Sequence, residues 1–347
     1  MHPPWKNEID FVRFLRRMRF SERRSVRMGI GDDAAVLRST GHKTQLFTTD
    51  MMVENVHFTL ETCAPEWLAY KLLARNVSDI AAMGGTPTCY VLSLAVPRNL
   101  PEDFLPRFYR GLKHAQKRMH AHLVGGDISS SPAAVLFSCI ALLGETMAAP
   151  LLRAGSKPND SIWVTGALGR SAVALELLRS GRAAVDTKNK RIAFAAISQA
   201  EARGRLKDIM KAHFFPQPRL AMGQWLAKRK IASAVIDLSD GLSTDLHRLC
   251  EASGLSAVIY PQHLPIARSV LLHARDPVEC ALHGGEDYEL LFTVPPRMEA
   301  KLKRLSAPLP LRRIGKMMAG KKKGVLVEMD GRLQQLEPGG FDHFSNR

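Results

Sequence analysis

The sequence predicts a two-domain protein of the α/β or α+β class. Its 347 residues are 46% hydrophobic and 24% charged, a soluble globular composition with enough chain for two cores. Strand-like runs alternate with amphipathic helical segments in both halves, which indicates sheets covered by helices. Residues 148–160 contain two prolines, a glycine and an asparagine, so we place the boundary there, between domains 1–149 and 150–347.

In the first half, apolar residues at helical spacing predict three helices, and runs of strand-forming residues predict three strands. The expected helices are 8–18, 65–74 and 102–121. The expected strands are 44–48, 91–96 and 133–143. Pro132 and Gly144 bound the last strand, which is short and apolar enough to be buried.

In the second half, the same criteria predict strands over 161–165, 232–238 and 290–294. Helices are expected over 170–179 and 242–250. Residues 180–211 are charged and irregular in pattern, and we expect them to be helical in part.

The net charge of +16 favours anionic partners. The basic residues are scattered, and no basic stripe interleaved with aromatic residues occurs, so steering of phosphorylated small molecules is favoured over nucleic-acid binding. No membrane span is expected, because the longest nearly apolar run has eleven residues, against the ~20 that a spanning helix needs. Five cysteines without a CxxC pair fit a reducing cytoplasm.

The motif search excludes several enzyme classes. The sequence contains no GxxxxGK[ST], HExxH or GxSxG pattern. Residues 29–34 match GxGxxA formally, but Asp32 and Asp33 would stand where a dinucleotide pyrophosphate must approach the helix. We therefore reject a Rossmann site.

Acidic residues recur in turns rich in Gly, Ser and Thr, each beside an apolar run. Carboxylates gathered in one cleft repel one another unless cations lie between them, and Mg²⁺ prefers such oxygen ligands together with phosphates. The set therefore predicts a magnesium-dependent polyphosphate site. Its members are Asp32, Asp33, Asp50, Asp79, Asp127, Asp237, Asp240, Glu286 and Asp287.

Each acid also has a purely structural interpretation. Asp240 is a candidate N-cap for the helix that begins at Leu242, and Ser78 or Asp79 could cap a short helix ending at Gly84. His57 could be a half-buried histidine beside a strand or a contact to substrate. Ser, Thr or Asn would cap equally well, so the repeated use of Asp favours the metal interpretation of the set.

An ordered series of motifs resembles the thiamine-monophosphate kinase family. The series comprises GIGDD (29–33), TTD (48–50), VHF (56–58), NVSDIAAMG (76–84), GGD (125–127), IDLSDGL (236–242), GGEDYEL (284–290) and GFDHF (340–344). The resemblance implies a two-domain fold like that of aminoimidazole ribonucleotide synthetase. This fold is α/β plus α+β, with the N-terminal sheet pairing across a homodimer.

The resemblance also implies substrates and site residues. The substrates would be ATP and thiamine monophosphate, with several Mg²⁺ ions and direct in-line transfer that needs no general base. The implied metal ligands are Asp33, Thr48, Thr49, Asp50, Asp79, Asp127 and Asp237, with Asp240 near a further ion. The implied ATP contacts are Tyr109, Gly126, Asp127, Arg153 and Ser239. The implied thiamine contacts are His57, Glu286 and Phe341.

Two alternatives remain open at this point. One is another ATP-using synthetase of the same superfamily, of the selenophosphate or aminoimidazole ribonucleotide type. The first cysteine, Cys63, lacks the Gly-rich context expected of a selenophosphate synthetase. The other alternative is a protein that binds metal or nucleotide without catalysis.

Overall fold

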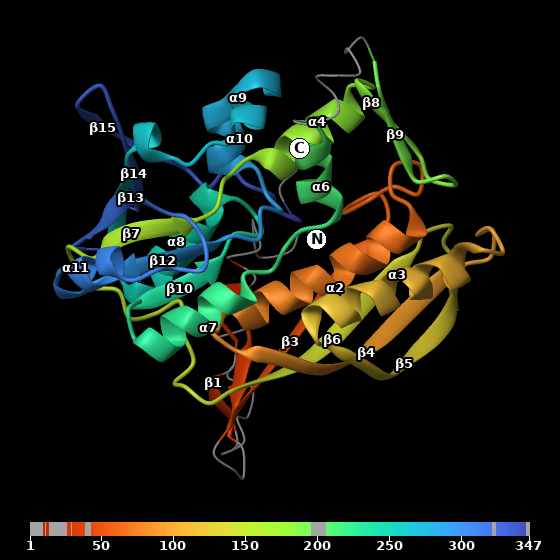
Figure 1. The fold of residues 1–347 in the computed structure, drawn as a ribbon, viewed down its shortest axis with the longest axis horizontal. Coiled ribbons are helices and arrows are strands. Elements are labelled where there is room, and N and C mark those ends of the chain that lie inside the picture. Colours follow the sequence, from red (N-terminus) through yellow and green to blue (C-terminus); the bar gives the residue numbers. More distant parts are fainter. Residues whose placement is uncertain are drawn as a thin grey trace, which may run out of the picture.

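The computed structural model describes residues 10, 12–13, 26–28, 30–38, 43–195, 206–320 and 324–344. These residues form two large sheets, each with helices packed against it, and a small hairpin (Figure 1). The long helix α2 (Pro65–Ala82) lies between the two halves.

The first sheet has six strands in the order β1-β2-β3-β6-β4-β5. Only the β4–β5 pair is parallel. The strands are β1 (Val26–Met28), β2 (Ala35–Leu37), β3 (Thr44–Val53), β4 (Thr86–Pro97), β5 (His122–Ser131) and β6 (Phe137–Thr146). Burial alternates along β3, with even-numbered residues from Leu46 to Met52 facing the helices and odd-numbered residues exposed.

Helices α2 and α3 (Phe104–Met119) cover one face of this sheet. Large apolar side chains on β3, β4 and β5 are exposed, including those of Phe47, Met51, Val91 and Ile128. Helix α2 is buried almost all round, because it contacts the sheet and α3 as well as β10 and α7 of the second half. A Cβ on Gly223 of α7 would lie 1.9 Å from the Ala81 carbonyl oxygen, so only glycine permits this approach.

The second sheet has seven strands in the order β10-β12-β7-β13-β11-β14-β15. Only the β11–β14 pair is parallel. The strands are β7 (Ser161–Thr165), β10 (Ala234–Asp237), β11 (Ser256–Ile259), β12 (Leu290–Val294), β13 (Leu311–Met318), β14 (Val325–Met329) and β15 (Arg332–Gln335). The second half of the chain contains helices α4 (Arg170–Arg179), α6 (Lys207–Phe214), α7 (Leu220–Arg229), α8 (Leu242–Ser253), α9 (Arg268–His273), α10 (Pro277–His283) and α11 (Pro296–Arg304).

Several predicted elements are confirmed with their bounds, namely strands 161–165 and 290–294 and helix 170–179. The helix expected to end at residue 74 continues to Ala82, because Val77, Ile80 and Ala81 extend its apolar surface. The interpretation of Ser78 or Asp79 as the cap of a separate short helix is therefore wrong. Part of segment 180–211 forms a hairpin of β8 (Ala183–Asp186) and β9 (Arg191–Phe194), followed by α6.

Most of the helix predicted over 8–18 lies outside the described residues. Residues 196–205 of the segment 180–211 also lie outside them. The strand predicted over 133–143 corresponds to β6, which begins and ends closer to the C-terminus, at Phe137 and Thr146. Within the described ranges, none of the helices combines the length and apolarity needed to cross a membrane. The domain boundary at 149/150 stays a prediction.

Candidate active site

A cleft of about 290 Å³ lies where the two halves meet. Its walls come from the turn before β2, from β3 and α2, from Arg153 in the connecting segment, from the loop after β10, and from α8. Nine of the predicted site residues line it together, although they are up to 207 positions apart in the sequence. They are Asp33, Thr48, Thr49, Asp50, Asp79, Arg153, Asp237, Ser239 and Asp240.

Three carboxylates form the centre of the cleft. One oxygen each of Asp33, Asp79 and Asp237 lies within 4.8 Å of the others. Thr48 Oγ1 donates a hydrogen bond to Asp79 Oδ2 (2.5 Å), and Ser78 Oγ donates one to Asp237 Oδ2 (2.6 Å). Asp33 Oδ2 is buried without a hydrogen-bond partner among the described residues. An unpartnered buried carboxylate oxygen beside two further carboxylates fits a site for a hard cation.

The electrostatics of this cluster favour the same conclusion. Burial raises the pKa of Asp79 well above its ordinary value, and the carboxylates of Asp50 and Asp237 raise it further. The pKa of Asp237 is raised in the same way, first by burial and then by Asp33. Ionising these carboxyl groups together is therefore costly in the protein alone, and a divalent cation would stabilise their ionised form.

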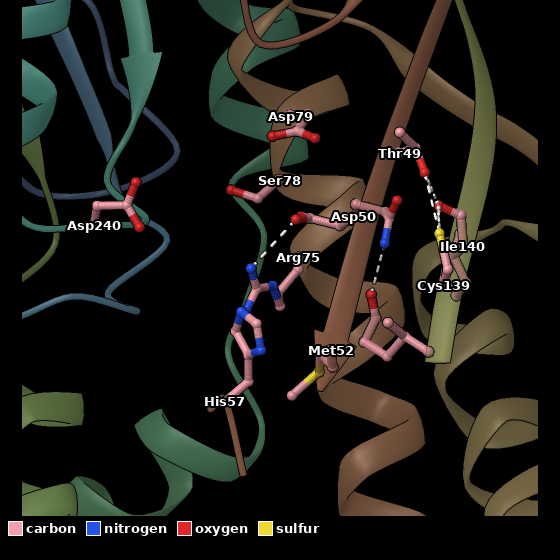
Figure 2. A network of polar contacts seen from close by, with 12 residues as sticks. Thr49, Asp50, Met52, His57, Arg75, Ser78, Asp79, Cys139, Ile140 and Asp240 are labelled. Atoms are coloured by element: carbon pink, nitrogen blue, oxygen red, sulfur yellow. Dashed lines mark hydrogen bonds and ion pairs between the residues drawn. The ribbon is translucent and has the colours of Figure 1, made fainter. Parts of the chain in front are cut away.

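Arginines surround the acidic centre. Arg153 Nε donates to Asp33 Oδ1 (3.0 Å), and the Arg153 backbone N–H donates to Asp32 Oδ2 (3.1 Å). Figure 2 shows the Arg75 guanidinium directed at Asp50, with Nη2 3.2 Å from Oδ1, and the His57 ring next to Arg75. Mixed arginines and carboxylates suit a ligand that carries phosphates together with metal ions.

Asp240 does not act as a helix cap. The N-cap position of α8 is occupied by Gly241, so Asp240 is not the N-cap residue of this helix. Instead, Asp245 Oδ2 accepts hydrogen bonds from the backbone N–H groups of Asp240 (3.1 Å) and Gly241 (3.2 Å), while Arg248 pairs with both Asp240 and Asp245. The cap interpretation of Asp240 is therefore wrong, and its carboxylate lines the cleft.

Three rings gather at one end of the cleft. The centroids of His57 and Phe341 are 6.1 Å apart, and His343, which lines the cleft, lies 5.2 Å from His57 and 4.7 Å from Phe341. His57 Nδ1 accepts a hydrogen bond from the Val53 backbone N–H (3.0 Å). Burial and then Arg75 lower the pKa of His57 to about 4, so its imidazole is neutral at pH 7. A neutral ring of this kind can stack on an aromatic or cationic ligand.

His57 and Phe341 lie beside the cleft without lining it. Four other predicted residues also do not line it. Glu286 lies behind the wall, in an ion pair with Lys71. Gly126 and Asp127 lie on β5 at the edge of the first sheet, three strands away from β3, which corresponds to about 14 Å. Tyr109 lies on α3 with 41% of its surface exposed.

Other residues at or behind the cleft were missed by the sequence analysis, namely Arg75, Arg248, Asp245 and Lys71. Arg75 precedes Asp79 by one helical turn, and Arg248 follows Asp245 by three residues. Helical spacing from the predicted Asp79 was therefore an available signal for Arg75, whereas Arg248 is spaced from Asp245, which the sequence analysis also missed. The sequence carries no comparable signal for Lys71, which contacts a residue 215 positions away.

Comparison with known proteins identifies the family of the chain. The chain matches the family models for the N-terminal domain of AIR synthase related proteins over residues 31–146 and for the C-terminal domain over 157–328. It is 36% identical to the thiamine-monophosphate kinase of Bacillus subtilis, with 92% of this chain and 94% of that protein covered. It is 35% identical to the corresponding protein of Escherichia coli K12, with 96% and 97% covered.

The fold matches a solved structure described as AaThiL complexed with AMPPCP and TMP. The TM-score is 0.82, the identity is 31%, and 99% of each chain is covered. The match spans both halves of the chain, which together form the acidic cleft. By sequence, fold and the residues gathered in the cleft, the chain belongs to the thiamine-monophosphate kinase family.

Proposed function

We propose that this protein transfers the γ-phosphoryl group of ATP to the phosphate of thiamine monophosphate, giving thiamine diphosphate. The main support for this proposal is the cluster of three carboxylates, which includes the unpartnered Asp33 Oδ2 and lies inside a cleft lined by arginines. Relatives of this family bear the name of that reaction, and a relative's complex with AMPPCP and TMP supports both substrates.

Asp33, Asp79 and Asp237 are proposed as the central Mg²⁺ ligands, because their oxygens already lie within 4.8 Å of one another. Further proposed ligands or neighbours of the ions line the same cleft, and they are Thr48, Thr49, Asp50 and Asp240. When bound, Mg²⁺ would neutralise and align the two phosphate groups.

The protein's own groups position both substrates. The acceptor oxygen belongs to a phosphate and is already anionic, so no general base is required. Arg153 and Ser239 are proposed to contact ATP, and Arg153 is held in place by Asp33. His57 and Phe341 are proposed to contact the thiamine part, beside His343.

The test is direct. Purified protein with ATP and Mg²⁺ should form ADP and thiamine diphosphate in equal amounts, and only when thiamine monophosphate is present. A precursor of aminoimidazole ribonucleotide, or selenide, should cause no ATP consumption above background, which separates this function from the related synthetases. ADP release at the same rate with and without thiamine monophosphate would contradict the proposal. A phosphoaspartate trapped during turnover would contradict direct transfer.

We also propose a homodimer in which the first sheet of each copy packs on that of the other. The face opposite α2 and α3 exposes Phe47, Met51 and Val91. Thr49 belongs to the exposed side of β3, and the register places Asp127 in one row with exposed Ser93 on the same side. In a two-fold pair, Asp127 of one copy would then lie near the other copy's Thr49, which assigns Gly126 and Asp127 to a shared site.

Subunit mixing tests the shared site. Asp127→Asn and Asp79→Asn should each be inactive alone, because each removes a ligand from every site. After co-refolding at equal amounts, about one quarter of wild-type activity should return, since half of the dimers are mixed and each contains one intact site. A mixture as inactive as its components would contradict contribution across the dimer.

All five cysteines are free thiols, and two of them, Cys63 and Cys250, are buried. Burial raises the pKa of Cys63 to about 12, which keeps it protonated and unreactive. We propose a reducing location, the cytoplasm, for this enzyme.

A further inference from the structure

A buried ion pair joins the two halves of the molecule behind the cleft. Lys71, in the middle of α2, has a side chain only 2% exposed, and its Nζ donates to Glu286 Oε2 (2.6 Å). Ser171 Oγ donates to the same oxygen (3.4 Å), and His213 Nδ1 lies 3.5 Å from it. Among the described residues, the polar contacts of this carboxylate are all made through Oε2, which leaves Oε1 for another partner.

The loop that carries Glu286 is fixed by its own backbone. Glu286 and Tyr288 both have left-handed backbone conformations, with φ of 65° and 50°. The Glu286 N–H donates to the Ser239 carbonyl (2.7 Å), and the Tyr288 N–H donates to the Leu238 carbonyl (2.8 Å). None of these bonds involves Lys71. The course of the loop is therefore set independently of Lys71, whose ion pair acts on the carboxylate of Glu286 alone.

Lys71 is the charged partner of this carboxylate. Burial would raise the pKa of Glu286, but Lys71 is the strongest opposing influence, and together with neighbouring groups it lowers the pKa to about 2. Burial and Lys71 lower the pKa of His213 to about 3, so this histidine is neutral at pH 7. A buried ion pair commonly adds little stability compared with apolar side chains of similar size, so its presence needs another reason.

The position of Glu286 relative to the cleft supplies that reason. Ser239, which accepts its N–H, and Tyr288, two residues further on, both line the cleft. Glu286 is also the predicted contact to thiamine, whose aminopyrimidine ring carries N–H donors that a carboxylate oxygen can accept. We infer that Lys71 is a positioning residue for the acceptor: by holding Oε2, it presents Oε1 of Glu286 as a charged hydrogen-bond acceptor to the aminopyrimidine ring. This inference rests on the proposed function.

The first test compares Lys71→Met with wild type. The KM for thiamine monophosphate should rise about ten-fold or more, because a charged hydrogen bond is lost, while kcat and the KM for ATP change by less than about three-fold. Lys71→Arg, which keeps the charge, should recover part of the affinity. Lys190→Met is the matched control, because Lys190 also pairs with a glutamate, Glu66 (3.5 Å), but is 48% exposed; it should change neither KM.

The second test asks whether Lys71 acts through Glu286. The double variant Lys71→Met/Glu286→Gln removes both charges together, and it should bind thiamine monophosphate as weakly as Glu286→Gln alone. This comparison also decides the question if Lys71→Met by itself fails to fold. Additive losses in the double variant, or equal losses toward ATP and thiamine monophosphate, would overturn the inference. A wild-type protein that forms no thiamine diphosphate would instead refute the proposed function.

Discussion

Asp79→Asn is expected to lower kcat at least about 100-fold with little change in the fold. Asp79 projects from α2 into the cleft, where it lies within 4.8 Å of Asp33 and Asp237. Asparagine keeps an oxygen that can accept the hydrogen bond from Thr48 Oγ1, so the local contact survives. The change removes one negative charge from the proposed Mg²⁺ site, and with it part of the stabilisation of the transferred phosphoryl group.

The measurement is initial-rate kinetics at saturating ATP and thiamine monophosphate over a series of Mg²⁺ concentrations. If Asp79 holds metal, high Mg²⁺ should restore part of the lost rate. Asp103→Asn provides the control, because Asp103 is an acid beside α3 whose side chain is 64% exposed, and its loss should leave kcat unchanged. Full turnover by Asp79→Asn at ordinary Mg²⁺ would show that this carboxylate is not a ligand.

The convergence of the acidic turns could be predicted from the sequence, because each turn follows an apolar run that packs in a core. Asp237 illustrates this, since Ala234–Asp237 is a fully buried strand that ends in the cleft. Asp33 and Asp79 reach the same point from a turn and from a helix. Local pattern identified the acids and predicted a magnesium-dependent polyphosphate site, and the family resemblance added the substrates and the role of each residue.

The remaining parts of the site depend on contacts between segments far apart in the chain. Helix α2 was predicted eight residues too short, because its C-terminal half is buried by α7 and β10 rather than by local partners. The pair of Lys71 and Glu286 joins α2 to a loop after α10, and no sequence periodicity links such positions. Asp127 illustrates a different limit, since it lies on the edge strand β5, away from the cleft, and would reach a site only in the dimer proposed above.

The same carboxylate cluster should make the metal-free protein less stable than a variant that lacks part of it. Asp237→Asn is expected to stabilise the metal-free protein by on the order of 1 kcal/mol or more, because it removes one of three neighbouring carboxyl groups that repel one another when ionised. The asparagine oxygen can still accept the hydrogen bond from Ser78 Oγ. Mg²⁺ should reverse the order, because it raises the Tm of the wild type and has a weaker site in the variant.

The dependence on pH follows from the direction of the pKa shifts. The folded-state pKa of Asp237 is raised well above the ordinary value of 3.8, so its proton-linked stability is fully present below pH 3.8 and is lost as the pH rises through the folded value. The metal-free wild type should therefore lose stability relative to Asp237→Asn as the pH rises from 5 to 8. Thermal unfolding of both proteins with a chelator, and then with Mg²⁺, measures the difference directly. A gap in Tm that stays constant with pH, or that Mg²⁺ leaves unchanged, would show that Asp237 carries no uncompensated charge in the folded protein, and the carboxylate cluster could then not be the metal site.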